Sequence, residues 1–309
     1  MTEPNQRPDA WWERALRILP PDRHAAFEEA FHAPRPMWLR VQTSRLSIDQ
    51  AVAELAPWGV QRWPGVPEAL RAPAEARSEL LRHALVAAGR VYPQSLSSML
   101  ATVTLDPQPG DHVLDLCAAP GSKTGHIGDR LGGTGRLVAN ELSRNRMFKM
   151  RAVLAALGVQ AEVRCGDGVQ LARRWRDSFD RVLVDAPCSG EGRFHAADPH
   201  SWSTWSVKRL KALASKQKAL LNAAMESVRP GGVVVYATCT LAPEENEAVV
   251  ARALKRYPGA VVEPVSIEGA LPGLTEWEGK ALRPEVEHCV RLPPGPDFDG
   301  FFLARLRAP

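Results

Sequence analysis

Val113-Leu-Asp-Leu-Cys-Ala-Ala-Pro-Gly-Ser-Lys-Thr124 is the stretch of sequence that decides the fold. Its apolar beginning predicts a strand, which passes into a tight loop of small residues before a helix that begins near Thr124. In a doubly wound α/β sheet, nucleotides and nucleoside-like cofactors bind at this place, in the crevice at the carboxyl ends of the strands. Ser122-Lys-Thr124 also resembles the end of a phosphate-binding loop, but the spacing G-x-x-x-x-G-K that such a loop requires is absent.

Strands alternate with amphipathic helices from Val113 onward, and this rhythm predicts an α/β fold with a parallel, doubly wound sheet. The segment Val207–Val228 has apolar side chains at helical spacing and lysines largely elsewhere, so we expect a covering helix with a basic outer side. The expected strands, including a late pair, are His112–Leu116, Gly135–Asn140, Ala161–Arg164, Arg181–Asp185, Gly232–Ala237, Val261–Pro264 and Phe301–Leu306.

The first ninety residues have a different pattern and predict a small α/β N-terminal domain. A helical pattern over Ala10–Ala33 is followed by the proline break Pro34-Arg-Pro36, and this order indicates a helix pair. A strand at Trp38–Thr43, a helix at Ile48–Leu55 and a turn at Pro57-Trp-Gly59 then indicate a small β-α-β module. We therefore predict an N-terminal domain over residues 1–90 and a catalytic domain over residues 91–309.

Composition excludes several classes of protein. Hydrophobic residues make up 45% of the 309 residues and charged residues 24%, and no window holds the roughly 18 uninterrupted apolar residues of a membrane span. The stretch Met1–Asp22 has no apolar region or cleavage site typical of a secretion signal. The five cysteines are odd in number and lack C-x-x-C spacing, which argues against disulfides and a zinc site. We expect a cytoplasmic protein with free thiols and no bound metal.

The basic residues are unevenly distributed. The formal net charge is +4, and residues 141–176 hold eight Lys or Arg against three Asp or Glu. Residues 201–230 hold six against one. Such windows are typical of a nucleic-acid interface, although solvated helix faces have the same composition, so both interpretations stay open here.

Acidic residues follow successive predicted strands. Glu141 lies 26 residues after Asp115, where an acid accepts hydrogen bonds from a ribose diol, and Asp167 in Gly166-Asp-Gly168 follows the next strand. Each acid alone could equally be a solvated residue or a helix N-cap. In series, and without the glycine fingerprint of a dinucleotide site, these acids favour an adenosyl cofactor over NAD.

Two cysteines follow neighbouring strands. Asp185-Ala-Pro-Cys188 ends one apolar strand, and Thr238-Cys239-Thr240 ends the next. A single cysteine is more often a small core residue than a nucleophile. Because the carboxyl ends of parallel strands share one crevice, two cysteines beside an acid indicate a reactive site.

These motifs resemble those of the Nop/Sun family of RNA cytosine-5 methyltransferases. The resemblance covers about Val91 to the end of the chain, and Arg40-Val-Gln-Thr43 also resembles a segment of the family's N-terminal extension, with Gln42 where asparagine is usual. The motifs are Tyr92-Pro-Gln94-Ser-Leu-Ser-Ser98-Met99, Cys117-Ala-Ala-Pro-Gly-Ser-Lys123-Thr, Asp185-Ala-Pro-Cys188-Ser-Gly190, Ala237-Thr-Cys239-Thr-Leu-Ala-Pro-Glu-Glu-Asn246-Glu and Gly300-Phe-Phe-Leu-Ala304.

The resemblance implies a Rossmann-like methyltransferase sheet, S-adenosylmethionine as cofactor and rRNA or tRNA as the partner. We expect the protein to be a monomer. It implies that Cys239 is the nucleophile, that Cys188 assists product release and that Asp185 takes part in the chemistry. The N-terminal domain is implied to bind RNA. The residues implied to hold the cofactor are Cys117, Ala118, Ala119, Pro120, Gly121, Ser122, Lys123, Glu141, Arg146, Asp167, Gly168 and Asp185.

The chain departs from the family's pattern at positions implied to contact RNA. Val153 and Ala156 stand where an asparagine and a basic residue are frequent, and Arg193-Phe-His-Ala-Ala-Asp198 lacks a basic pair before Asp-Pro. Two alternatives remain: a catalytically silent RNA-binding protein of ribosome assembly, and a DNA cytosine-5 methyltransferase. The latter would use a nucleophile in a Pro-Cys pair, as at Cys188, whereas Thr-Cys239-Thr favours RNA.

Overall fold

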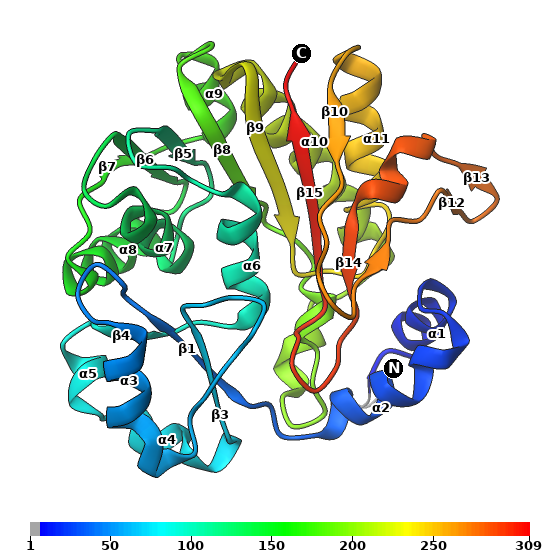
Figure 1. Ribbon diagram of the computed structural model, residues 1–309. Helices are drawn as coiled ribbons and strands as arrows, with labels where there is room; N and C mark the ends of the chain where they lie inside the picture. Colours follow the sequence, from blue (N-terminus) through cyan, green and yellow to red (C-terminus); the bar gives the residue numbers. More distant parts are fainter. Residues whose placement is uncertain (1–6) are drawn as a thin grey trace.

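A mixed sheet of nine strands forms the centre of residues 7–309, the part of the chain that the computed structural model describes (Figure 1). Its parallel half runs in the order β7-β6-β5-β8-β9, and β15 lies antiparallel beside β9. This order confirms the predicted doubly wound α/β sheet. The bounds are β5 (His112–Asp115), β6 (Arg136–Glu141), β7 (Glu162–Cys165), β8 (Phe179–Asp185), β9 (Val228–Thr238) and β15 (Phe301–Arg307).

The far edge of the sheet is built from short antiparallel strands. The predicted late pair is confirmed, because β10 (Val261–Glu263) pairs with β15. Strands β11 (Leu271–Pro272) and β14 (Val290–Leu292) extend the same edge, and β12 (Glu276–Trp277) pairs with β13 (Lys280–Ala281). The sequence did not indicate these four strands, because two or three residues are too few to show a period-two pattern.

Helices cover both faces of the sheet, and alternation along β9 explains why. Val234 and Tyr236 point into one apolar core with α10 and α11, whereas Val233 and Val235 point into another with α6 and α7. The predicted covering helix is α10. The bounds are α6 (Leu96–Leu105), α7 (Ser122–Leu131), α8 (Arg144–Leu157), α9 (Gly168–Arg173), α10 (Val207–Ser227) and α11 (Glu247–Arg256).

The N-terminal part forms a smaller antiparallel sheet in the order β2-β3-β1-β4. The predicted β-α-β order begins it, but β3 lies between β1 and β2, and all pairs are antiparallel. Strand β4 follows residue 90 and pairs with β1, so this sheet reaches past the proposed boundary, which stays a prediction. The bounds are β1 (Met37–Val41), α3 (Ile48–Leu55), β2 (Gln61–Arg62), β3 (Ala69–Ala72), α4 (Arg77–Leu80), α5 (Ala84–Ala87) and β4 (Val91–Pro93).

The predicted helix pair is present as α1 (Asp9–Ile18) and α2 (His24–His32), divided at two prolines. The pair lies apart from the N-terminal sheet (Figure 1) and packs on the segment that follows β8, where the ring of Trp11 lies 4.9 Å from that of Phe194. Part of the stretch Met1–Asp22, judged above not to be a secretion signal, lies outside the described residues. Within residues 7–309, no helix is long and apolar enough to cross a membrane.

Polar contacts tie the N-terminal sheet to α7, the helix that follows the first loop. The Asp129 carboxylate accepts hydrogen bonds from the backbone N–H groups of Thr43 and Ser44, at 2.8 and 3.0 Å, and from both hydroxyls. Arg40, with its side chain fully buried, lies 3.7 Å from the same carboxylate. The segment Arg40-Val-Gln-Thr43 therefore contacts α7 through Asp129.

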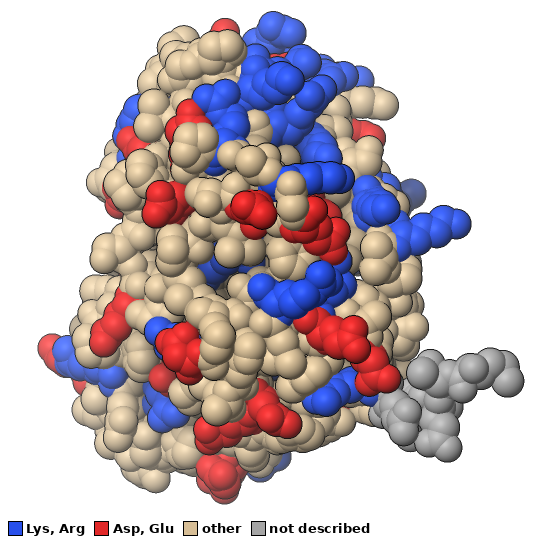
Figure 2. Space-filling model, turned by 90° about the vertical axis from the view of Figure 1, so that its right-hand side faces the viewer, with Lys and Arg blue, Asp and Glu red and all other residues tan. Residues whose placement is uncertain are grey.

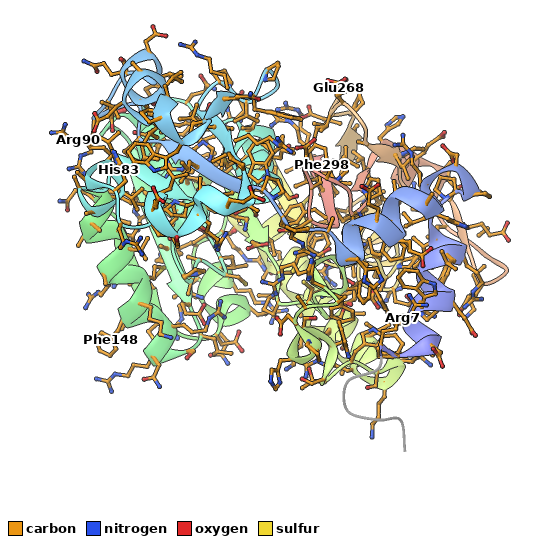
Figure 3. All side chains as sticks on the ribbon, turned by 90° about the horizontal axis from the view of Figure 1, so that it is seen from below. Arg7, His83, Arg90, Phe148, Glu268 and Phe298 are labelled. Atoms are coloured by element: carbon orange, nitrogen blue, oxygen red, sulfur yellow. The ribbon has the colours of Figure 1, made fainter. Side chains whose placement is uncertain are left out.

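The loop between β14 and β15 lies against the N-terminal sheet. Figure 3, seen from below, places Phe298 between this sheet and the end of the large sheet, and its ring lies 6.3 Å from that of Trp63. Arg71 on β3 donates to Asp297 at 2.8 Å. The loop therefore bridges the two sheets immediately before β15.

Candidate active site

The carboxyl ends of the parallel strands meet where the strand order reverses, between β5 and β8. In register, Asp115 of β5 lies beside Ala139 of β6 and Leu183 of β8, and Asp185 lies beside Ala237 of β9. This switch point is where ligands bind in open α/β sheets. The residues predicted for the site lie at these strand ends, in the loops that follow them or in the first turns of α7 and α8. Asp167 and Gly168 follow β7 and begin α9.

The first loop, Cys117 to Gly121, leads into an open helix terminus. Gly121 is the N-cap of α7 with φ at 108°, a backbone conformation that favours glycine, and no described side chain caps this helix. The first N–H groups of a helix have no partner within it, so those of α7 are available to an anionic group. Arg146 of α8 donates to the carbonyl of Ala119 at 2.6 Å and fixes the loop from the other side.

Glu141, at the end of β6, is buried beside this loop, with 3% of its surface exposed. Its carboxylate accepts the Ser143 N–H at 2.8 Å and lies 3.3 Å from the Arg146 guanidinium. The structure thus brings Glu141 and Arg146 together with the first loop. A buried carboxylate at this strand end can accept hydrogen bonds from the two hydroxyls of a ribose.

Asp167 has a different local environment. It is the exposed N-cap of α9, where its Oδ1 accepts the N–H groups of Val169 and Gln170 at 2.8 and 3.2 Å. Gly168 begins that helix, and a side chain there would press on Leu116. The structure therefore assigns a capping role to Asp167, and its contact with a cofactor stays a prediction.

Asp185, at the end of β8, and Lys123, in the first turn of α7, form an ion pair. Lys123 Nζ donates to Asp185 Oδ2 at 2.7 Å, although the two residues are 62 positions apart. Asp115, below them in β5, accepts the Thr124 hydroxyl at 2.7 Å, and burial raises its pKa to about 7. Asp115 was not predicted as a site residue, and the signal that could have revealed it is an acid at the end of an apolar strand.

The two cysteines are in contact. Cys188 Sγ lies 3.1 Å from Cys239 Sγ and accepts the Cys239 N–H at 3.3 Å. The pKa of Cys239 lies below its ordinary value because the Cys188 thiol donates a hydrogen bond to it, and the Arg193 guanidinium lowers it further. The pKa of Cys188 lies well above its ordinary value because of the bond to Cys239 and burial. The arrangement therefore favours a thiolate on Cys239.

Sequence reasoning missed the support of this pair. Glu191, Thr240 and Glu245 lie buried beneath the thiols, and Thr240 contacts both carboxyl groups. The position of the Arg193 guanidinium near Cys239 was not predicted either. No local pattern reveals these roles, because Glu191 is 49 residues from Thr240.

The sheet order and the ligand edge at its switch point define a Rossmann-like methyltransferase domain. The model of a family described as 16S rRNA methyltransferase RsmB/F matches residues 102–307. The chain belongs to this family, within the Nop/Sun RNA cytosine-5 methyltransferases.

Curated relatives act on two kinds of RNA. A tRNA (cytosine(49)-C(5))-methyltransferase of Pyrococcus abyssi (strain GE5 / Orsay) is 39% identical over 224 residues, which are 72% of this chain and 71% of that protein. Ribosomal RNA small subunit methyltransferase F of Enterobacter sp. (strain 638) is 36% identical over 311 residues, 97% of this chain. This chain spans only 63% of the length of that ribosomal relative.

Solved structures agree on the fold. A methyltransferase homolog protein from Pyrococcus horikoshii superposes with a TM-score of 0.84 at 30% identity, covering 98% of this chain and 96% of that one. NSun6 from Pyrococcus horikoshii, solved with SFG, an analogue of S-adenosylmethionine, gives a TM-score of 0.80 at 24% identity, covering 97% and 98%.

Proposed function

We propose that this chain transfers a methyl group from S-adenosylmethionine to carbon 5 of a cytosine in rRNA or tRNA, through a covalent adduct on Cys239. The observation that carries the proposal is the contact between Cys188 and Cys239, 3.1 Å apart, beside the Lys123–Asp185 ion pair. Family membership supports RNA cytosine-5 methylation as the reaction.

Carbon 5 of cytosine is too weak a nucleophile to take a methyl group directly, so a thiolate must first add to carbon 6. Cys239 suits this step because its pKa is lowered, whereas Cys188 has a raised pKa and would be largely protonated. This difference favours Cys239 over Cys188 as the nucleophile, and so disfavours the DNA-type alternative.

The remaining steps also involve Cys239 and Cys188. Sulfur adds to carbon 6, and the electron pair released at carbon 5 forms a bond to the methyl group as the bond between that group and the sulfonium sulfur breaks, so that a neutral thioether leaves. The carbon 5 proton then passes to a water that Cys188 orients, or to Cys188 itself once its own thiol proton has passed to solvent. The Cys239 sulfur leaves as carbon 5 and carbon 6 regain their double bond. In this proposal Asp185 bonds the edge of the ring, and the hydrogen bond from Lys123 supports its position.

The first loop and its neighbours fit the proposed cofactor. When bound, S-adenosylmethionine supplies the methyl group on a sulfonium. The open N-terminus of α7 would take its carboxylate, and Glu141, held by Arg146, would accept its ribose hydroxyls. The predicted contacts of Cys117–Lys123, Asp167 and Gly168 belong to the same proposal.

The target base must leave its stack, since both faces of the ring react, and single-stranded or loop RNA allows this at least cost. Figure 2 shows Lys and Arg side chains gathered in the upper part of the side that lies at the right in Figure 1. The second basic window contains the exposed residues Lys208, Lys211 and Lys216 of α10. We propose that such residues and the N-terminal domain grip the RNA backbone, and that the protein acts as a cytoplasmic monomer.

The test is methyl transfer to unmodified RNA transcripts and to DNA of the same sequence, followed by nucleoside analysis. We expect 5-methylcytosine in RNA only. Methylation of DNA would support the DNA-type alternative, and no methylation of total RNA from a deletion strain would favour the catalytically silent protein. Bisulfite sequencing of that RNA identifies the target cytosine.

A further inference from the structure

A buried polar cluster lies beneath the two cysteines, around the carboxyl groups of Glu191 and Glu245. Glu191 is 2% exposed and Glu245 is fully buried. The Thr240 hydroxyl stands between them, 3.1 Å from Glu191 Oε2 and 3.3 Å from Glu245 Oε1. Burying an unpaired charge is costly, so two buried carboxyl groups that contact one hydroxyl are not expected to be both charged.

The cluster joins the two cysteine segments. Ser189 directly follows Cys188, and its hydroxyl lies 2.7 Å from that of Thr240, which directly follows Cys239. The Ser189 N–H donates to Glu245 at 3.0 Å. On the other side, the N–H of Gly192 donates to the Cys239 carbonyl at 3.0 Å. The contact between the thiols therefore depends on hydrogen bonds within this cluster.

The donors are distributed unequally between the acids. Glu245 Oε2 accepts both the Ser189 N–H and the Gln217 amide, at 3.0 and 2.7 Å. Among residues 7–309, Glu191 accepts only the Trp205 indole N–H, at 2.7 Å on Oε1, in addition to its contact with Thr240. The single proton of Thr240 can serve one acid only. The better-supplied acid, Glu245, is then the carboxylate, and a proton on Glu191 completes the contact with Thr240.

We propose that Glu191 is a positioning residue that, carrying a proton, donates to Thr240 and holds Cys239 against Cys188. The inference rests on the proposed function of Cys239. The charged groups that face Glu191 are Glu245, after β9, and Arg14 of α1, which is already paired with Glu244 at 2.8 Å. Burial raises the pKa of Glu191 to about 7, which agrees with a protonated acid in this place.

Ionisation of Glu191 has two consequences. Two carboxylates would compete for one hydroxyl proton, which loosens the Thr240 segment, and a second negative charge would disfavour the Cys239 thiolate. As the pH rises through the pKa of Glu191, the reactivity of Cys239 should therefore increase less than it would if residue 191 stayed neutral. Glu191→Gln stays neutral at every pH, and its amide can donate to Thr240 while its carbonyl accepts from Trp205.

The experiment measures alkylation of Cys239 by iodoacetamide between pH 6 and 9, located by peptide mass spectrometry, in the full chain. We expect Glu191→Gln to match the wild type within twofold at pH 6.5 and to react at least threefold faster at pH 8.5. Glu191→Ala should react at least fivefold more slowly at pH 6.5, because the thiol contact is lost. The matched control is Glu263→Gln, a half-buried acid on β10 paired with Arg305, and it should follow the wild type.

Equal rates for the wild type and Glu191→Gln at pH 8.5, or a glutamine variant as slow as the alanine variant at pH 6.5, would overturn the proposal. If Glu191→Ala does not fold, the comparison of glutamine with the wild type decides alone. The readout needs neither RNA nor cofactor. The expected alkylation pattern without methyl transfer would therefore overturn the proposed function and leave the role of Glu191 intact.

Discussion

Replacing Asp129 with alanine should destabilise the contact between the N-terminal sheet and α7. The Asp129 side chain is 1% exposed, and it accepts hydrogen bonds from two backbone N–H groups and two hydroxyls. The Arg40 guanidinium also lies 3.7 Å from its carboxylate. Arg40 would then keep its charge in a fully buried position without its nearest carboxylate. Breaking a buried pair in this way costs about 3–5 kcal/mol of the free energy of unfolding.

The assay is urea unfolding followed by circular dichroism, with hydrogen exchange to locate the loss in Thr43 and Ser44. Asp129→Asn keeps one acceptor oxygen and should lose less than the alanine variant. The control is Asp49→Ala, since Asp49 pairs with Arg62 on the surface with 85% of its side chain exposed, and such pairs contribute about 1 kcal/mol or less. A loss for Asp129→Ala no larger than that of the control would refute the reasoning.

Three further outcomes are expected. Glu141→Ala should weaken S-adenosylmethionine binding in calorimetry by about 1–3 kcal/mol, the cost of leaving ribose hydroxyls unpaired, and unchanged affinity would remove Glu141 from the site. Burial lowers the pKa of His126 to about 4 from 6.5, so this histidine takes up a proton in the unfolded chain before it does so in the folded protein. The free energy of unfolding should therefore fall by about 3 kcal/mol between pH 6.5 and pH 4. His126→Gln should flatten this dependence, and an unchanged slope in the variant would contradict the prediction. RNA binding should weaken steeply with salt as phosphates release counterions, and a flat dependence would mean that Lys208 and Lys211 are only a solvated face.

The predictable part of the fold is the part with a regular pattern. Strand β9 contains Val233 to Tyr236, a run of apolar residues that only a strand covered on both faces would bury, and the parallel order followed from helices between such runs. At the antiparallel edge, β10 and β15 were expected, but β11 and β14 (Val290–Leu292) were not, because strands of two or three residues are too short to show a pattern. The packing of Trp11 on Phe194 also carries no local signal.

The candidate site was predictable wherever residues follow strand ends. Asp185, Cys188 and Cys239 were expected in one crevice, and the structure brings them there. The pairing of Lys123 with Asp185 and the cluster of Glu191 and Glu245 were not expected. Their partners come from distant loops, and only the folded backbone sets their distances.

The central claim is that Cys239 forms the bond to the base and that Cys188 is needed to release it. The most direct measurement is denaturing electrophoresis of each cysteine variant after reaction with S-adenosylmethionine and RNA. Cys188→Ala should add, methylate once and stall, which gives a protein–RNA band that disappears with ribonuclease. Cys239→Ala and the double variant should give no such band, because the thiolate that adds to carbon 6 is missing. A band in Cys239→Ala and none in Cys188→Ala would contradict the account and make Cys188 the nucleophile.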